Sequence, residues 1–320
     1  MNKYKLIFLS VLIFFFGSIF FYGIILSMNV NCEHLSTTIT IEKGYSVNDV
    51  SRILENNLCI SSTLFKIAIK MTFNESNIRH GSYDLKSAIN VRDLISILTS
   101  MSSDRVRITI FEGMRLQEIA LRLTKKMNFN VEKFVAACYD KDFIESLGLF
   151  NVNTLEGYLF PDTYIFLKTY TEKDVIKVMV KQFIYNYNEH VEKKSNYSMQ
   201  DIVTLASIIQ GEAMYVDEMK TISSVYHNRL KKNMLLQADP TIQYILPKHK
   251  KRVLYNDTQI ENPYNTYLYK GLPPGPINSP GIDAIIAANN PDNTSYLYFV
   301  SNGKGRHIFN RTYRGHLNSK

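Results

Sequence analysis

Residues 6–28 carry no charged side chain, and Leu, Ile, Val and Phe dominate this run. A helix of about 20 apolar residues is long enough to cross the hydrocarbon layer of a membrane. Lys3 and Lys5 precede the run and residues 29–32 carry no positive charge, so the positive-inside rule predicts a cytoplasmic tip at residues 1–5 and export of the remainder. A cleaved signal peptide is the alternative, but the run exceeds a usual signal core and no small-residue cleavage site follows closely. The sequence therefore predicts one transmembrane helix over residues 6–28.

The charge and the cysteines exclude several classes of function. A net charge of +8 over 320 residues is a mild basic excess, and no basic stripe with interleaved aromatic residues indicates nucleic acid. An anionic surface or polymer outside the cell is the favoured partner, with plain solubility as the alternative. Cys32, Cys59 and Cys138 are far apart and form no C-x-x-C motif, so neither a zinc cluster nor a redox pair is indicated. An oxidising compartment could pair two of them, and the odd number leaves at least one free.

Two segments at a spacing of 69 residues match each other. Ile39–Gly44 and Ile108–Gly113 both begin with Ile-Thr-Ile and end in Gly, and apolar residues at helical spacing follow each of them. Each segment predicts a strand, a glycine turn and a helix. With further helices expected over residues 62–70 and 91–99, we predict a membrane-proximal β-α region over residues 29–125.

The remainder of the chain predicts a second, mainly helical domain over residues 126–320. Apolar residues recur at helical spacing in four segments, Val131–Tyr139, Asp174–Glu192, Met199–Met214 and Val216–Lys231. Proline and glycine then recur through residues 263–281, which predicts ordered turns. A helix over residues 282–288 and a strand over residues 296–300 are expected to follow. The fold class predicted for the whole chain is α+β.

Glu212 is the strongest candidate for a chemical role. Ser198 and Asp201 predict a capped helix start, and Leu205, Ile208 and Glu212 then share one face of the helix. A carboxyl group in line with apolar neighbours is a candidate for a raised pKa, because desolvation penalises its charged form. A solvated glutamate at the end of a helix is the alternative.

Glu156 is a second candidate. It lies with Asp162 among aromatic residues in a turn-like segment, and acidic groups beside aromatic rings suit sugar binding. A packed loop in which Glu156 caps a neighbouring backbone is the alternative. The motifs of nucleotide-binding, zinc-protease and serine-triad enzymes are absent from the sequence, and the histidines show no ligand spacing, so no metal or cofactor is expected.

Seven segments, in this order, resemble the MltG-type (YceG-like) endolytic murein transglycosylase family. They are Leu155–Gly157 through Pro161–Tyr164, Ala206–Glu212 (ASIIQGE), Val225–Leu230 (VYHNRL), Leu236–Thr241 (LQADPT), Pro263–Tyr267 (PYNTY), Gly271–Ile277 (GLPPGPI), and Tyr296–Val300 with Gly303–His307 (GKGRH). The N-terminal apolar run and the β-α region, which is similar to the family's LysM-like part, extend the resemblance over nearly the whole chain.

The resemblance implies a single-pass protein of the inner, cytoplasmic membrane with its catalytic domain outside the cytoplasm. It implies cleavage of the β-1,4 bond between N-acetylmuramic acid and N-acetylglucosamine in nascent peptidoglycan strands, which leaves 1,6-anhydro ends and terminates elongation. The family's catalytic acid is the second Glu of an E-x-E motif, which corresponds to Glu212. The first Glu of that motif is replaced here by Gln210.

A lytic transglycosylase needs only one carboxyl group, whereas an ordinary glycosidase needs two. The single strong candidate, Glu212, is therefore enough for this reaction. The resemblance implies that the glycan groove is lined by matched positions, namely Glu156, Gln237, Asp239, Tyr264, Asn265 and Tyr267. A non-catalytic peptidoglycan-binding scaffold and a hydrolytic muramidase using Glu212 and Glu156 are the alternatives. The expected partners are peptidoglycan strands and the membrane-bound glycan polymerases.

Overall fold

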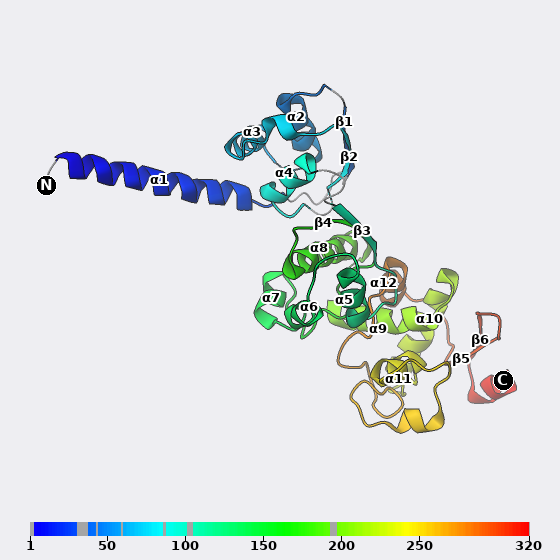
Figure 1. The fold of residues 1–320 in the computed structure, drawn as a ribbon. Helices are drawn as coiled ribbons and strands as arrows, with labels where there is room; N and C mark the ends of the chain where they lie inside the picture. The colour runs from blue at the N-terminus through cyan, green and yellow to red at the C-terminus, as the bar shows by residue number, and fades with distance from the viewer. Residues whose placement is uncertain are drawn as a thin grey trace. The chain divides into compact units, whose positions relative to one another are not determined.

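The computed structural model describes residues 3–30, 38–42, 44–58, 60–85, 88–100, 105–192 and 197–319. The chain divides into two compact units, Met1–Ile108 with Tyr164–Tyr170, and Thr109–Thr163 with Thr171–Lys320 (Figure 1). Both helices and strands are present in the fold, which is α+β as predicted. Cys32 and Cys59 lie outside the described residues, and Cys138 is buried and free of any disulfide.

The first unit begins with the helix α1, Lys3–Ser27 (Figure 1). Within the described segments, no helix is both long and apolar enough to cross a membrane. The single transmembrane helix predicted over residues 6–28 is therefore not supported by the structure.

A small βααβ arrangement follows α1 in the first unit. Its elements are β1 (Thr38–Ile41), α2 (Val47–Asn57), α3 (Ser62–Met71) and β2 (Gly81–Asp84), with a 3-10 turn, η1, at Glu75–Asn77. β1 and β2 pair antiparallel, with Ile39 opposite Tyr83. The helix α4 (Val91–Thr99) buries Leu94 and Leu98 against this group. The strands β3 (Arg105–Thr109) and β4 (Thr163–Leu167) form a second two-stranded sheet.

The second unit is mainly helical, as predicted. Its helices are α5 (Leu116–Thr124), α6 (Val131–Ala137), α7 (Lys141–Ser146), α8 (Glu172–His190), α9 (Met199–Glu212), α10 (Val216–Lys231), α11 (Asp239–Ile245), the 3-10 helix η3 (Tyr255–Gln259), α12 (Ile282–Asn289) and α13 (Tyr313–Asn318). Near the C-terminus, β5 (Tyr298–Ser301) and β6 (His307–Asn310) form an antiparallel hairpin.

The core of this unit is built around α9. Every residue from 202 to 209 of α9 is buried, and the helix packs against α10, α11 and α12. α12 is short and rich in Ala and Ile, so it can approach α9 closely. The buried helix holds its C-terminal end in a fixed place, and that end carries Glu212.

Both predicted strand-turn-helix segments are present in the structure. Gly44 and Gly113 take positive φ angles of 96° and 76°, and the helices after them are α2 and α5. α5, however, packs against α6 within the second unit. The contacts thus divide the chain near residue 108, whereas the sequence predicts a boundary at residue 125.

Gly157 is required for close packing in the second unit. Its φ is +86°, and a Cβ atom there would lie 2.5 Å from Cβ of Pro276. Gly148 has a similar φ of +83°, but nothing lies within 4 Å of the position that its Cβ would take. Alanine variants at the two positions therefore separate the free-energy cost of the left-handed backbone from the cost of a steric clash.

We expect Gly148→Ala to lower the free energy of unfolding by about 1 kcal/mol, the cost of a left-handed backbone conformation. Gly157→Ala should cost at least about 1–3 kcal/mol more, because it also forces the Pro276 loop outward. Denaturant unfolding of the full-length chain measures both values. Equal losses for the two variants would contradict the close packing at Gly157.

Candidate active site

Glu212 is the last residue of α9. The helix starts with the predicted capping box, in which Ser198 Oγ accepts from the Asp201 amide at 3.1 Å and the Ser198 amide donates to Asp201 Oδ2 at 3.0 Å. Leu205 and Ile208 are buried on the same face as Glu212, as predicted. Glu212 itself is half-buried, so its carboxyl group lies at the edge of the apolar core.

Tyr226 holds the Glu212 carboxyl group in place. Its hydroxyl donates to Glu212 Oε1 at 2.8 Å, and Tyr226 is 1% exposed in the middle of α10. Burial raises the pKa of Glu212 to about 7, because its charged form loses solvation. The hydrogen bond from Tyr226 lowers this pKa, the negative charge of Asp239 raises it, and the positive charge of Arg229 lowers it. Glu212 can therefore hold a proton near neutral pH and release it at little cost.

A glycine brings α11 against the last turn of α9. A Cβ atom on Gly211 would lie 2.7 Å from Cβ of Pro240, so only glycine allows this approach. Asp239 precedes Pro240 at the start of α11, and its Oδ1 accepts a short hydrogen bond from the Tyr267 hydroxyl. Because Pro240 lies against Gly211, the neighbouring Asp239 is close enough to act on the pKa of Glu212, although Asp239 itself is exposed.

Arg229 ties two loops to α10. Its Nε donates to the Leu297 carbonyl at 2.7 Å, and a terminal nitrogen donates to the Leu236 carbonyl at 2.7 Å. The guanidinium group also lies 5.3 Å from the centre of the Tyr298 ring. The loop that leads to Asp239 and the first strand of the C-terminal hairpin are thus held to the helix that carries Tyr226.

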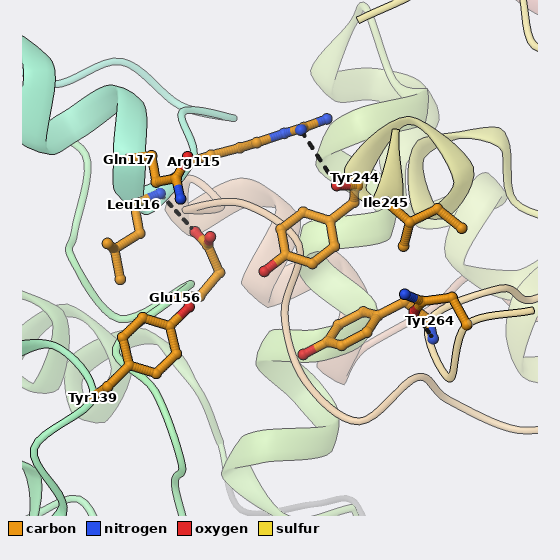
Figure 2. Close-up of a pocket in the computed structure, with 9 residues that line it drawn as sticks. Arg115, Leu116, Gln117, Tyr139, Glu156, Tyr244, Ile245 and Tyr264 are labelled. Carbon is orange, nitrogen blue, oxygen red and sulfur yellow. Dashed lines mark hydrogen bonds between the residues drawn. The ribbon is translucent and has the colours of Figure 1, made fainter. Parts of the chain in front are cut away.

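Glu156 lies in surroundings of its own. Figure 2 shows it beside Leu116, in a pocket that it lines. It is 4% exposed, and its Oε1 accepts from the Leu116 amide at 2.9 Å, so it caps the first turn of α5. Burial raises its pKa to about 7, the Leu116 amide and the positive charge of Arg115 lower it, and Glu118 raises it. The charged groups that act on Glu156 are therefore not those that act on Glu212.

The other predicted substrate positions lie in four different kinds of place. Asp239 and Tyr267 lie with Glu212, whereas Tyr264 lines the cavity that contains Glu156. Asn265 is fully buried, and its Nδ2 donates to the Thr258 and Ile260 carbonyls at 3.0 and 2.7 Å, so its contacts are those of a loop-fixing residue. Gln237 is exposed at a positive φ of 49°, and its backbone amide donates to the Thr266 carbonyl.

Gln210 takes part in a hydrogen-bond arrangement that a carboxylate would disturb. Its Oε1 accepts from the Gly281 amide at 3.0 Å, and its side chain also hydrogen-bonds to Glu112. An amide can accept and donate at once, whereas an ionised carboxylate only accepts. Burial raises the pKa of Glu112, and the nearby Asp283 raises it further. A second carboxylate at position 210 would add repulsion to this group.

The sequence assigns no role to two residues of the site. Tyr226 and Arg229 lie one helical turn apart on α10, within a segment that resembles the family but predicts only a helix. The sequence signal that could have identified them is their spacing of three residues, which puts an aromatic hydroxyl and a guanidinium group on one face of the helix. Among the described residues, no group of three or more His, Cys, Asp or Glu side chains could hold a metal ion.

Comparison with known proteins identifies a family and several relatives. The model of the YceG-like family matches residues 39–320. A Bacillus subtilis protein named endolytic murein transglycosylase is 37% identical over 324 residues, which cover 95% of this chain and 89% of that protein. A Streptococcus pneumoniae (strain D39) protein of the same name is 29% identical over 96% of this chain, which spans only 63% of that relative. The crystal structure of a yceG-like protein of Listeria monocytogenes matches with a TM-score of 0.61 and 32% identity, over 88% of this chain and 98% of that one.

Two substitutions should move the pKa of Glu212 in opposite directions. Tyr226→Phe removes a hydrogen bond that favours the carboxylate, so the pKa should rise above about 7. Asp239→Asn removes a nearby negative charge, so the pKa should fall. Titration of carboxyl-labelled protein by ¹³C NMR measures both shifts. Shifts of the same sign would contradict the site geometry.

Replacing Gln210 by Glu should destabilise the protein at neutral pH. We expect Gln210→Glu to lower Tm at pH 7.5 by about 2–4 °C, which corresponds to about 1 kcal/mol, and less at pH 5. The pH dependence arises because acid protonates the paired carboxylates. Adding Glu112→Gln to this variant should restore most of the loss, and a loss that the double variant keeps would contradict the proposed repulsion.

Proposed function

The chain belongs to the YceG-like family, and from that premise we propose that it is an endolytic lytic transglycosylase of peptidoglycan with Glu212 as its catalytic acid. The substrate is the glycan strand, and the bond cut is the β-1,4 link between N-acetylmuramic acid and N-acetylglucosamine. The observation that carries this proposal is a carboxyl group with a pKa of about 7, fixed at the end of a buried helix.

The first step is protonation of the glycosidic oxygen. Glu212 enters the reaction in its neutral form and gives its proton to the leaving oxygen as the bond to C1 of the muramic acid residue breaks. A pKa near 7 suits this step, because an acid of ordinary pKa would already be ionised at neutral pH. The hydrogen bond from Tyr226 aims the carboxyl group and stabilises the carboxylate that forms.

The second step uses the substrate's own hydroxyl group. The Glu212 carboxylate takes the proton from the C6 hydroxyl of the muramic acid residue, and the C6 oxygen attacks C1 to close a 1,6-anhydro ring. Glu212 is then protonated again, so the cycle needs no water. The atoms balance because the proton given to the leaving oxygen is replaced by the proton of the C6 hydroxyl.

Asp239 supports the transition state by its charge. Positive charge develops at C1 when the glycosidic bond breaks, and a carboxylate near Glu212 stabilises it electrostatically. The same negative charge raises the pKa of Glu212 and so keeps the acid protonated before reaction. Tyr267 holds Asp239 in position through its hydroxyl.

A hydrolytic muramidase that pairs Glu212 with Glu156 is less well supported. The two carboxyl groups of such an enzyme lie within about 10 Å of each other across the bond that is cut. The charges that act on the pKa of Glu212, however, are those of Asp239 and Arg229, and not that of Glu156. One oxygen of Glu156 is also occupied by the Leu116 amide. These contacts favour a mechanism with a single carboxyl group.

We further propose that the chain is anchored in the cytoplasmic membrane by its N-terminal segment, with the catalytic part outside the cytoplasm. The uncharged sequence of residues 6–28 and the lysines before it support this orientation. An anchored enzyme that cuts new strands would work beside the membrane-bound glycan polymerases, which we propose as its partners.

Replacing Glu212 by Gln should abolish cleavage and leave the fold intact. We expect a loss of at least about 10²–10⁴-fold, because an amide cannot supply the proton. Incubation of the full-length protein with purified peptidoglycan, followed by mass spectrometry of soluble products, measures it. The matched control is Glu132→Gln, which changes an exposed carboxylate on α6. Anhydro products from the Glu212→Gln variant at the wild-type rate would contradict the assignment.

The anchor is tested by extraction of membranes. The full-length chain should stay in the membrane after alkaline carbonate treatment, and a variant that lacks residues 1–28 should be released. Affinity purification of the full-length chain after detergent solubilisation should recover a glycan polymerase. Release of the intact chain by carbonate would contradict the anchor, and recovery of no polymerase would contradict the partnership.

A further inference from the structure

A cavity of about 330 Å³ lies in the second unit at the start of α5. Glu156 is among the residues that line it, together with three tyrosines, Tyr139, Tyr244 and Tyr264, and with Arg115 (Figure 2). These residues come from α11 and from the segments before α5, after α6, after α7 and after η3. The mechanism proposed for Glu212 uses none of them.

The cavity contains a buried carboxyl group beside aromatic rings. Glu156 is 4% exposed, and the Tyr244 and Tyr264 rings lie with their centres 5.0 Å apart and inclined by 45° (Figure 2). Glu156, Tyr244 and Tyr264 line the same cavity, and the negative charge of Glu156 raises the pKa of both tyrosine hydroxyl groups. A carboxylate and aromatic faces together suit an ammonium group, which gains a salt bridge and cation–π contacts.

Arg115 supplies a positive charge to the same cavity. Its guanidinium group lies 5.4 Å from the centre of the Tyr244 ring and donates to the Tyr244 carbonyl at 3.5 Å. One long hydrogen bond leaves most of the five donors of a guanidinium available, and their planar arrangement matches a carboxylate. The cavity therefore offers partners for an ammonium group and for a carboxylate at once.

We propose that this cavity binds the free zwitterionic amino-acid end of a peptide attached to the glycan strand, with the ammonium group at Glu156 and the carboxylate at Arg115. The proposal rests on the proposed function for the choice of a peptidoglycan peptide. The volume is at the small end of ligand pockets, which suits an amino-acid end and not a disaccharide. The cavity would make the enzyme prefer strands that carry peptides without cross-links.

Three synthetic peptides test the two charges separately. The first is N-acetyl-L-alanyl-γ-D-glutamyl-meso-diaminopimelate, which has the zwitterionic end and no other ammonium group, and the other two carry the same N-acetyl group. The second has lysine in place of diaminopimelate and lacks only the distal carboxylate, and the third has Nε-acetyl-lysine and lacks the ammonium as well. Calorimetric titration of the full-length protein should show affinities that fall in this order, by about tenfold for each charged group that the peptide lacks.

Single substitutions show which residue is responsible for each decrease in affinity. Arg115→Met should bind the first two peptides equally, because it removes the partner of the distal carboxylate. Lys141→Met is the matched control, since Lys141 is an exposed cation on α7 whose ion pair is with Glu145. Tyr264→Leu should weaken the binding of both of the first two peptides. Equal affinity of the wild type for all three peptides, or equal effects of Arg115→Met and Lys141→Met, would overturn the proposal.

Cleavage assays separate this proposal from the proposed function. The wild type should have a lower KM for peptide-bearing strands than for strands stripped of peptides by an amidase, and Arg115→Met should bring the two KM values together. Equal KM values in the wild type would overturn the peptide site. Cleavage of neither substrate would contradict the proposed function, whereas the peptide titrations would still decide whether the cavity binds the zwitterion.

Discussion

The hydrogen bond from Tyr226 to Glu212 joins the end of α9 to the middle of α10, and much of the second unit serves to keep these two groups together. α12 packs along the buried length of α9, and Gly211 lets Pro240 rest on its last turn. Arg229 holds the loops around Leu236 and Leu297 to α10, and the Phe299 ring meets Tyr226 edge to face at 5.9 Å. A single carboxyl group is thus supported by segments that are far apart in the sequence.

The consequence of this arrangement is a carboxyl group that the fold partly removes from water. Its ionised form is disfavoured by burial, so its pKa of about 7 lies where one group can act first as acid and then as base. Tyr226 and Asp239 shift that pKa in opposite directions and so set it between an ordinary glutamate and a permanently neutral one. Glu156 has a similar pKa, but it caps the first turn of α5 and lines the cavity at the start of that helix.

Regular local patterns are readable from the sequence, and long-range contacts are not. The helical spacing of apolar residues locates α8, α9 and α10 closely, and the glycine turns locate α2 and α5. β4 is not predicted because its five residues, TYIFL, show no clear polar alternation, and its pairing with β3 spans more than 50 residues. Glu212 becomes a candidate from its line of apolar neighbours, whereas the loop-fixing contacts of Asn265 depend on carbonyl positions that only the folded loop creates.

The proposed reaction depends on one carboxyl group that works with the substrate's own C6 hydroxyl in place of water. Cleavage of peptidoglycan in water enriched in ¹⁸O tests this most directly, because mass spectrometry shows whether the new chain ends contain ¹⁸O. The mechanism predicts anhydro ends that contain no ¹⁸O. Muramic acid ends that have gained one ¹⁸O atom would show that water attacks C1 and would contradict the mechanism.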